Sequence, residues 1–162
     1  MTRINENLYT NNIVIEFLKS KGYTRDSILQ EVSISTDPTQ RLFADIILMN
    51  ESNKDYLAII EVKRIIKPGS LESAKRQIHR YIHALSHLNI PGYIFAFDQN
   101  NNMNIYSLNK DGIWNEIDDE HFPNYTSLTT IEEKKRELKQ TIKKKRNVDI
   151  FLMICIIAAV IT

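Results

Sequence analysis

The sequence predicts an α/β fold. Two short apolar runs, at 42–49 (LFADIILM) and 56–63 (YLAIIEVK), are typical of strands, and the polar link between them indicates a hairpin. Residues 71–88 carry apolar side chains three or four positions apart, which is the spacing of a helix packed on a sheet. With 162 residues, 43% of them hydrophobic, the chain is long enough to form one domain with a substantial core.

The other elements are predicted from the same patterns. An amphipathic helix comes first and ends at the Lys-Gly-Tyr sequence of 21–23, and a turn is expected at 37–40 (DPTQ). The predicted order is a helix at 6–21, strands at 29–35, 42–49 and 56–63, a helix at 71–88, and strands at 93–97, 104–108 and 113–117. A polar linker then leads into a charged helix at 130–145. The domain therefore has the order α-β-β-β-α-β-β-β, followed by a basic helix and an apolar tail.

The apolar tail, 148–162 (VDIFLMICIIAAVIT), follows a basic run at 134–146. As a helix of about 1.5 Å per residue it spans roughly 22 Å, which is less than the ~30 Å of a hydrocarbon layer. Local thinning of the bilayer and snorkelling of the basic side chains can offset the difference. We interpret the tail as a membrane segment, either a short span or the start of a longer one. The alternative is a buried C-terminal helix, although core helices are usually apolar on one stripe only.

Composition divides the chain into three parts: a folded domain at 1–120, a charged linker helix at 121–147 and the membrane segment at 148–162. The polar N-terminus lacks the apolar centre of a signal peptide. The single cysteine, Cys155, excludes an intramolecular disulfide and a cysteine-based zinc site. We expect a cytoplasmic protein that associates with the membrane through its C-terminus, with the KKKR run at 143–146 on the cytoplasmic side.

Two acidic residues, Asp45 and Glu61, interrupt the apolar runs of the predicted hairpin. Because strand positions alternate between faces, Glu61 and Lys63 project to the same side. A buried charge is costly unless it is paired or binds a metal. Both carboxylates are suitable Mg²⁺ ligands, and the Val62 carbonyl is a further candidate, while Lys63 would orient a water molecule for hydrolysis. The simpler alternative is a Glu-Lys ion pair at the strand end, with Asp45 capping a turn.

Residues 41–47 (RLFADII) and 57–63 (LAIIEVK) together resemble the core of PD-(D/E)xK nucleases. The resemblance is closest to the N-terminal nuclease domain of type I restriction enzyme R subunits. Ala74, Gln77 and Tyr81 in the following helix match that family's A-x-x-Q-x-x-x-Y pattern. In the family, the glutamine lies near the active site and the tyrosine packs close by.

The resemblance covers about residues 10–98. It implies a restriction-endonuclease-like core, with a central mixed β-sheet flanked by helices. It also implies Mg²⁺-dependent hydrolysis of DNA, with Mn²⁺ as a substitute metal and a role in restriction or defence against foreign DNA. No helicase or methyltransferase motif is present in the chain.

The chain departs from the family pattern at two positions. Ala44 occupies a position where many members have proline, and Asn12 occupies a first-helix position that often holds a glutamate. Glu16, one turn later, and Glu31, on the first strand, are the candidates to replace that acid. Glu31 is the favoured metal ligand because a strand residue beside Asp45 has a fixed direction.

Three histidines, His79, His83 and His87, recur four residues apart in the predicted helix. They lie opposite its apolar side, so we expect them to face solvent rather than bind a metal. Several cations follow the second strand of the hairpin and are candidates for phosphate contacts: Arg64, Lys67, Lys75 and Arg76.

The sequence therefore predicts a Mg²⁺-dependent deoxyribonuclease. Asp45, Glu61 and Lys63 are its expected centre, with Gln77 and Glu31 assisting. A homodimer is compatible with cutting both strands of DNA. The alternative is a catalytically inactive nuclease-fold module that binds nucleic acid or a protein partner at the membrane.

Overall fold

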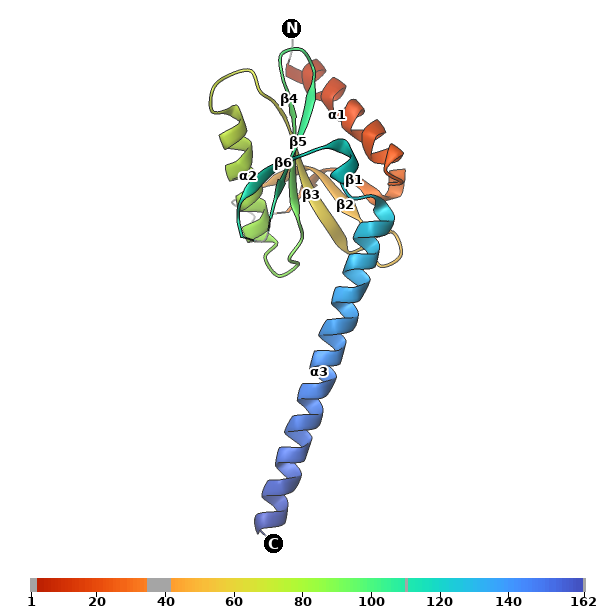
Figure 1. The fold of residues 1–162 in the computed structure, drawn as a ribbon, viewed down its shortest axis with the longest axis vertical. Helices are drawn as coiled ribbons and strands as arrows, with labels where there is room; N and C mark the ends of the chain where they lie inside the picture. Colours follow the sequence, from red (N-terminus) through yellow and green to blue (C-terminus); the bar gives the residue numbers. More distant parts are fainter. Residues whose placement is uncertain (1–2, 35–41, 110, 162) are drawn as a thin grey trace. The chain divides into compact units, whose positions relative to one another are not determined.

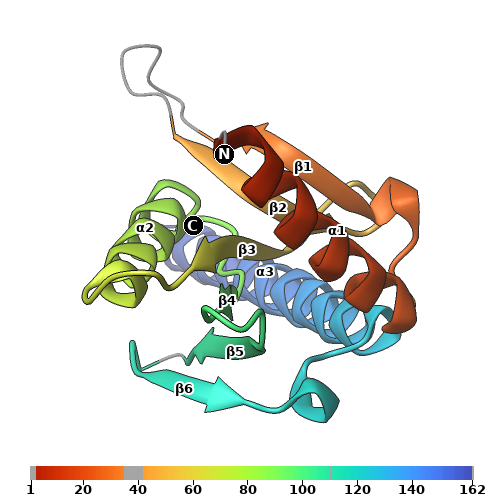
Figure 2. The same cartoon turned by 90° about the horizontal axis from the view of Figure 1, so that it is seen from above.

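A six-stranded sheet forms the centre of the fold, and its strands lie in sequence order from β1 to β6. The strands are β1 (Ile28–Ser33), β2 (Phe43–Met49), β3 (Tyr56–Arg64), β4 (Gly92–Phe97), β5 (Met103–Leu108) and β6 (Trp114–Ile117). All neighbours pair in antiparallel fashion except β3 and β4, which are parallel. Figure 2 shows this order, with β1 at the top and β6 at the bottom. The prediction of a mixed sheet is confirmed.

This computed structural model describes residues 3–34, 42–109 and 111–161, with the backbone alone at 3–11, 145 and 147–161. Its helices are α1 (Arg3–Ser20), α2 (Ser70–Ala84) and α3 (Tyr125–Ile161), with short 3-10 turns η1 (Arg25–Ser27) and η2 (Asp119–His121). The chain comprises two units, Met1–Thr126 and Ser127–Thr162. In the first unit α1 and α2 flank opposite faces of the sheet (Figure 1), and the predicted order of elements is confirmed. The turn predicted at 37–40 lies outside the described residues.

The central strands are buried on both faces because each face carries a helix. All six residues of β4 are buried, as are five consecutive residues of β3, from Leu57 to Glu61. Such strands read as continuous apolar runs rather than as an alternation of apolar and polar residues. A charged residue within β3 therefore lies in the domain core.

Helix α2 makes the crossover that two parallel strands require. It packs Ala74, Ile78 and Tyr81 onto the sheet, at the spacing predicted for its apolar face. The helix lies close to β4 at Gly92, where an added Cβ would come within 2.5 Å of Ile78 Cγ2. This close approach brings the side chains of α2 against the strands that carry the acidic residues.

The opposite face packs against α1 through an aromatic cluster. Phe17 contacts Phe95 of β4 and Phe122 in edge-to-face geometry, with ring centroids 5.5 Å apart in both pairs. Val14 and Leu18 of α1 are fully buried. The α1 face therefore packs mainly through apolar side chains. The acidic residues of the hairpin lie on the α2 face.

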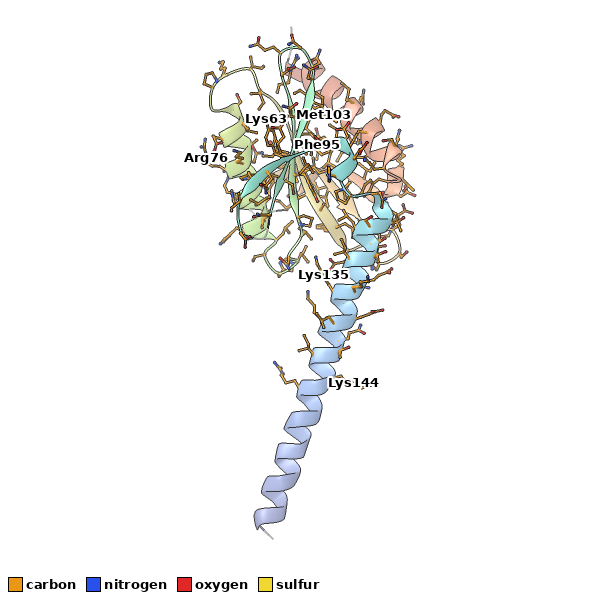
Figure 3. The ribbon with its side chains drawn as sticks, viewed as in Figure 1. Lys63, Arg76, Phe95, Met103, Lys135 and Lys144 are labelled. Carbon is orange, nitrogen blue, oxygen red and sulfur yellow. The ribbon has the colours of Figure 1, made fainter. Side chains whose placement is uncertain are left out.

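The second unit consists of helix α3 from Ser127 onward. Its described side chains are mostly exposed, including Ile131, Leu138 and Ile142, and Figure 3 labels Lys135 and Lys144 along it. The side chains of the apolar tail lie outside the described residues. Among the residues that the structure describes, no helix combines the length and the apolar character needed to cross a bilayer.

Candidate active site

Asp45 and Glu61 lie opposite each other on β2 and β3. The ladder between these strands pairs Ile47 with Ile59 and Ile46 with Ile60, so its next position brings the two acidic residues together. The regular pairing stops there. Instead, the Val62 N–H donates a hydrogen bond of 2.8 Å to Asp45 Oδ2. A side-chain carboxylate thus takes the place of a backbone acceptor where the strands separate.

Glu61 is the most deeply buried acidic residue among those described, with only 2% of its surface exposed. It lies on the face covered by α2, where the Tyr81 hydroxyl is 3.3 Å from Glu61 Oε2. Lys63 Nζ lies 3.9 Å from Glu61 Oε1, and its side chain is 36% exposed. The predicted group of Asp45, Glu61 and Lys63 is therefore brought together at one end of β3 (Figure 3 labels Lys63).

Burial, and after it the nearby charge of Asp45, together raise the pKa of Glu61 to about 8, against the opposing effect of Lys63. Burial also raises the pKa of Asp45, although the Val62 N–H and Lys63 act in the opposite direction. A hydrogen bond between the two carboxyl groups raises the pKa of Glu61 and lowers that of Asp45, so Glu61 is the donor. At neutral pH the pair holds one proton, because Lys63 alone would not neutralise two ionised carboxylates.

A chain of hydrogen bonds fixes Glu61 from the side of α2. The Gln77 side-chain amide donates to the Tyr81 hydroxyl. That hydroxyl in turn donates to the carbonyl oxygen of Phe43 at 2.5 Å, with Glu61 as a second acceptor. Among the contacts of the described residues, Gln77 reaches the predicted site only through Tyr81. These hydrogen bonds connect α2 with both strands of the hairpin and limit the movement of the Glu61 carboxyl group.

Glu31 lies on β1 at the level of Asp45, because Gln30 pairs with Ile46 and Val32 with Ala44. It adopts a left-handed conformation with φ of 50°, which non-glycine residues seldom adopt. Its side chain is exposed, and its charge is one of the causes that raise the pKa of Asp45. Strand alternation therefore does not set the direction of Glu31, contrary to the reasoning that favoured it.

Glu16 and Asn12 belong to α1, on the opposite face of the sheet from the Tyr81–Glu61 contact. Glu16 forms an exposed ion pair with Lys19 at 2.7 Å. The structure thus separates Glu16 from the carboxyl pair. Of the two candidates for the missing acid, only Glu31 carries a charge that raises the pKa of Asp45.

The donors at this site are those that Mg²⁺ prefers. Magnesium is commonly held by one or two carboxylates and keeps several waters. Asp45 and Glu61 are two such carboxylates, and a divalent cation would replace the proton that now lies between them. Within 3–34, 42–109 and 111–161, no group of three or more His, Cys, Asp or Glu side chains is arranged to hold a metal ion. Val62 contacts the pair through its N–H, and its carbonyl remains a predicted ligand.

The remaining polar candidates lie around α2. The three predicted solvent-facing histidines, His79, His83 and His87, are exposed, and His79 accepts a hydrogen bond from the Trp114 indole at 3.3 Å. Lys67 and Arg76 are exposed as well. Lys75 forms an ion pair with Glu72 at 2.7 Å, and Arg64 donates to Asn101.

The hydrogen-bond donor that Tyr81 presents to Glu61, and the role of the Phe43 carbonyl, were not predicted. The sequence pattern indicated only that Tyr81 packs near the site. A buried tyrosine hydroxyl requires a hydrogen-bond partner, so the sequence could have predicted that Tyr81 makes such a bond. The identity of its acceptor depended on the placement of α2 over the hairpin.

No protein-family model matches the chain, and no curated protein is significantly similar to it.

The raised pKa of Glu61 predicts that the protein without metal becomes less stable as the pH rises. The unfolded carboxyl titrates near 4.5 and the folded one near 8, so the folded state binds more protons between these values. The stabilising contribution is complete below the unfolded pKa and is lost as the pH passes about 8. The loss is on the order of a few kcal/mol. Urea unfolding in EDTA at pH 5.5 and 8.5 measures it.

Glu61→Gln is the control for this experiment, because an amide of similar shape does not titrate. We expect its unfolding free energy to change much less between the two pH values. An equal pH dependence in both proteins would show that Glu61 is not the group responsible.

Proposed function

We propose that the chain is a metal-dependent endonuclease of the PD-(D/E)xK type, with a restriction-endonuclease-like core, that hydrolyses phosphodiester bonds in DNA. The observation that carries the proposal is the buried Asp45–Glu61 carboxyl pair with Lys63 at 3.9 Å from Glu61. An ordinary ion pair would not leave the Glu61 carboxyl with a pKa near 8, because its partner would hold it ionised. A divalent cation would supply the positive charge that two ionised carboxylates require.

In this proposal each residue has a separate role. Asp45 and Glu61 would hold Mg²⁺ or Mn²⁺, with Glu31 and the Val62 carbonyl as the further predicted ligands. The bound cation would polarise the phosphate and activate a water for attack. Lys63 orients that water and balances developing charge. Gln77 is a positioning residue, since it acts on Glu61 through Tyr81.

Lys63→Ala is expected to abolish cleavage of plasmid or linear DNA in Mg²⁺, because the variant lacks the only cation within 4.0 Å of Glu61 among the described residues. Loss of one such group typically reduces the rate about 10²- to 10⁴-fold. The fold should persist, since Lys63 is partly exposed. Gel assays of cleavage, with circular dichroism as the fold check, measure both.

Lys139→Ala is the matched control, since Lys139 is an exposed cation on α3. It should retain full activity. Wild-type cleavage by the Lys63→Ala protein would contradict the proposed role.

A second candidate function is a nuclease fold that binds nucleic acid or a protein partner without cleaving. The observation that favours it is that the described residues hold two convergent carboxylates rather than three. Its signature is an absence of cleavage by the wild type in both Mg²⁺ and Mn²⁺, together with DNA affinity that falls steeply with salt.

We also propose that the C-terminal part holds the protein at the cytoplasmic face of a membrane. The support is the sequence: the apolar segment 148–162 follows the basic run 143–146, whose charge attracts anionic lipid headgroups. The proposed nuclease would act as a homodimer, in which each of two sites cuts one strand of the DNA.

The membrane proposal is tested with a chain that ends at Asn147. The full chain should float with phosphatidylserine-containing vesicles in a density gradient, and the shortened chain should remain largely in the soluble fraction. Equal flotation of the two chains would contradict a membrane role for the tail.

A further inference from the structure

A cavity of about 240 Å³ lies on the sheet face covered by α1, away from the carboxyl pair. Its lining comes from three elements: Ile15 and Lys19 of α1, Arg25 of η1, and Ile28 and Gln30 of β1. A water molecule occupies about 30 Å³ in the liquid, so the cavity has room for a group considerably larger than a few waters. Neither Asp45 nor Glu61 contributes to it.

The lining combines an apolar floor with a cationic rim. Ile28 is buried and Ile15 is half-buried, while Lys19 and Arg25 are exposed cations. The Arg25 guanidinium makes no hydrogen bond or ion pair with any other residue that the structure describes. Lys19 is paired with Glu16 at 2.7 Å, but both side chains are largely exposed, so the pair is weak and its lysine can turn to a ligand.

The loop that carries Arg25 is held in place by several contacts. The chain leaves α1 through Gly22, whose φ is 86°, and Tyr23 is buried with its hydroxyl donating to the Pro123 carbonyl at 3.0 Å. Ser27 is fully buried and its hydroxyl donates to the Thr24 carbonyl at 2.9 Å. Arg25 is therefore presented beside the last turn of α1 by a well-fixed loop.

The chemistry of the cavity fits a phosphate attached to an apolar or planar group. A phosphate monoester carries close to two negative charges near neutral pH, which matches one arginine and one lysine. Arginine can bind phosphate through two parallel hydrogen bonds, and the Gln30 amide adds a neutral donor. The isoleucine floor suits the face of a base or sugar rather than a bare ion.

We propose that this cavity is a nucleotide phosphate-binding site, separate from the carboxyl pair. The phosphate belongs either to a free mononucleotide or to the end of a nucleic-acid strand, and both present the same chemistry. The site needs no metal and no cleavage, so it does not depend on the proposed nuclease activity.

Calorimetry in EDTA tests the proposal with three probes: adenosine 5′-monophosphate, a 5′-phosphorylated oligothymidylate and adenosine. At least one phosphorylated probe should bind, and adenosine should bind at least tenfold more weakly than adenosine 5′-monophosphate if that nucleotide binds. Arg25→Ala should weaken binding of the phosphorylated probe tenfold or more. Glu16→Gln, which frees Lys19, should tighten it severalfold. Binding of adenosine 5′-monophosphate identifies a free-nucleotide site, and binding of the oligonucleotide alone identifies a strand end.

Arg80→Ala is the matched control, because Arg80 is an exposed arginine of α2, on the opposite face of the sheet. It should leave the affinity unchanged, and circular dichroism checks the fold of every variant. The proposal is overturned if neither phosphorylated probe binds, or if Arg25→Ala binds as tightly as wild type.

Discussion

The enclosure of two carboxyl groups in one apolar site is the constraint on which the candidate site depends. Asp45 and Glu61 occupy opposite positions of a hairpin, and α2 covers the face on which Glu61 lies. Two adjacent negative charges are strongly disfavoured there, so the pair keeps a proton that each carboxyl would lose in water. A divalent cation could replace that proton without rearranging the strands. The same burial that makes the pair costly for stability makes it suitable for a cation.

The fold produces this enclosure through one crossover. Because β3 and β4 are parallel, α2 must pass over the sheet between them, and the close approach at Gly92 holds the helix near the strands. Tyr81 then reaches both the Phe43 carbonyl and the Glu61 carboxyl group. The site is thus formed by a helix and two strands, which fix side-chain positions better than loops do.

Much of the fold could be predicted from the sequence, because the strands are clear apolar runs and α2 has regularly spaced apolar residues. The contact between Asp45 and Glu61 also followed, since two acids in paired apolar runs need a common partner. The alternation argument for Glu31 does not hold, because its left-handed backbone interrupts the regular strand, and its role as a metal ligand stays a prediction. The Tyr81 hydrogen bonds could not be foreseen, because they depend on how α2 is rotated and shifted over the hairpin.

Proton release during metal binding tests the central claim most directly. Mn²⁺ is titrated into the protein at pH 7 in two buffers that differ in ionisation enthalpy, and the difference in heat gives the number of protons released. With a Glu61 pKa near 8, we expect close to one proton per bound ion, and little release from Glu61→Gln. Absence of Mn²⁺ binding, or binding without proton release, would contradict the assignment of Asp45 and Glu61 as a metal site.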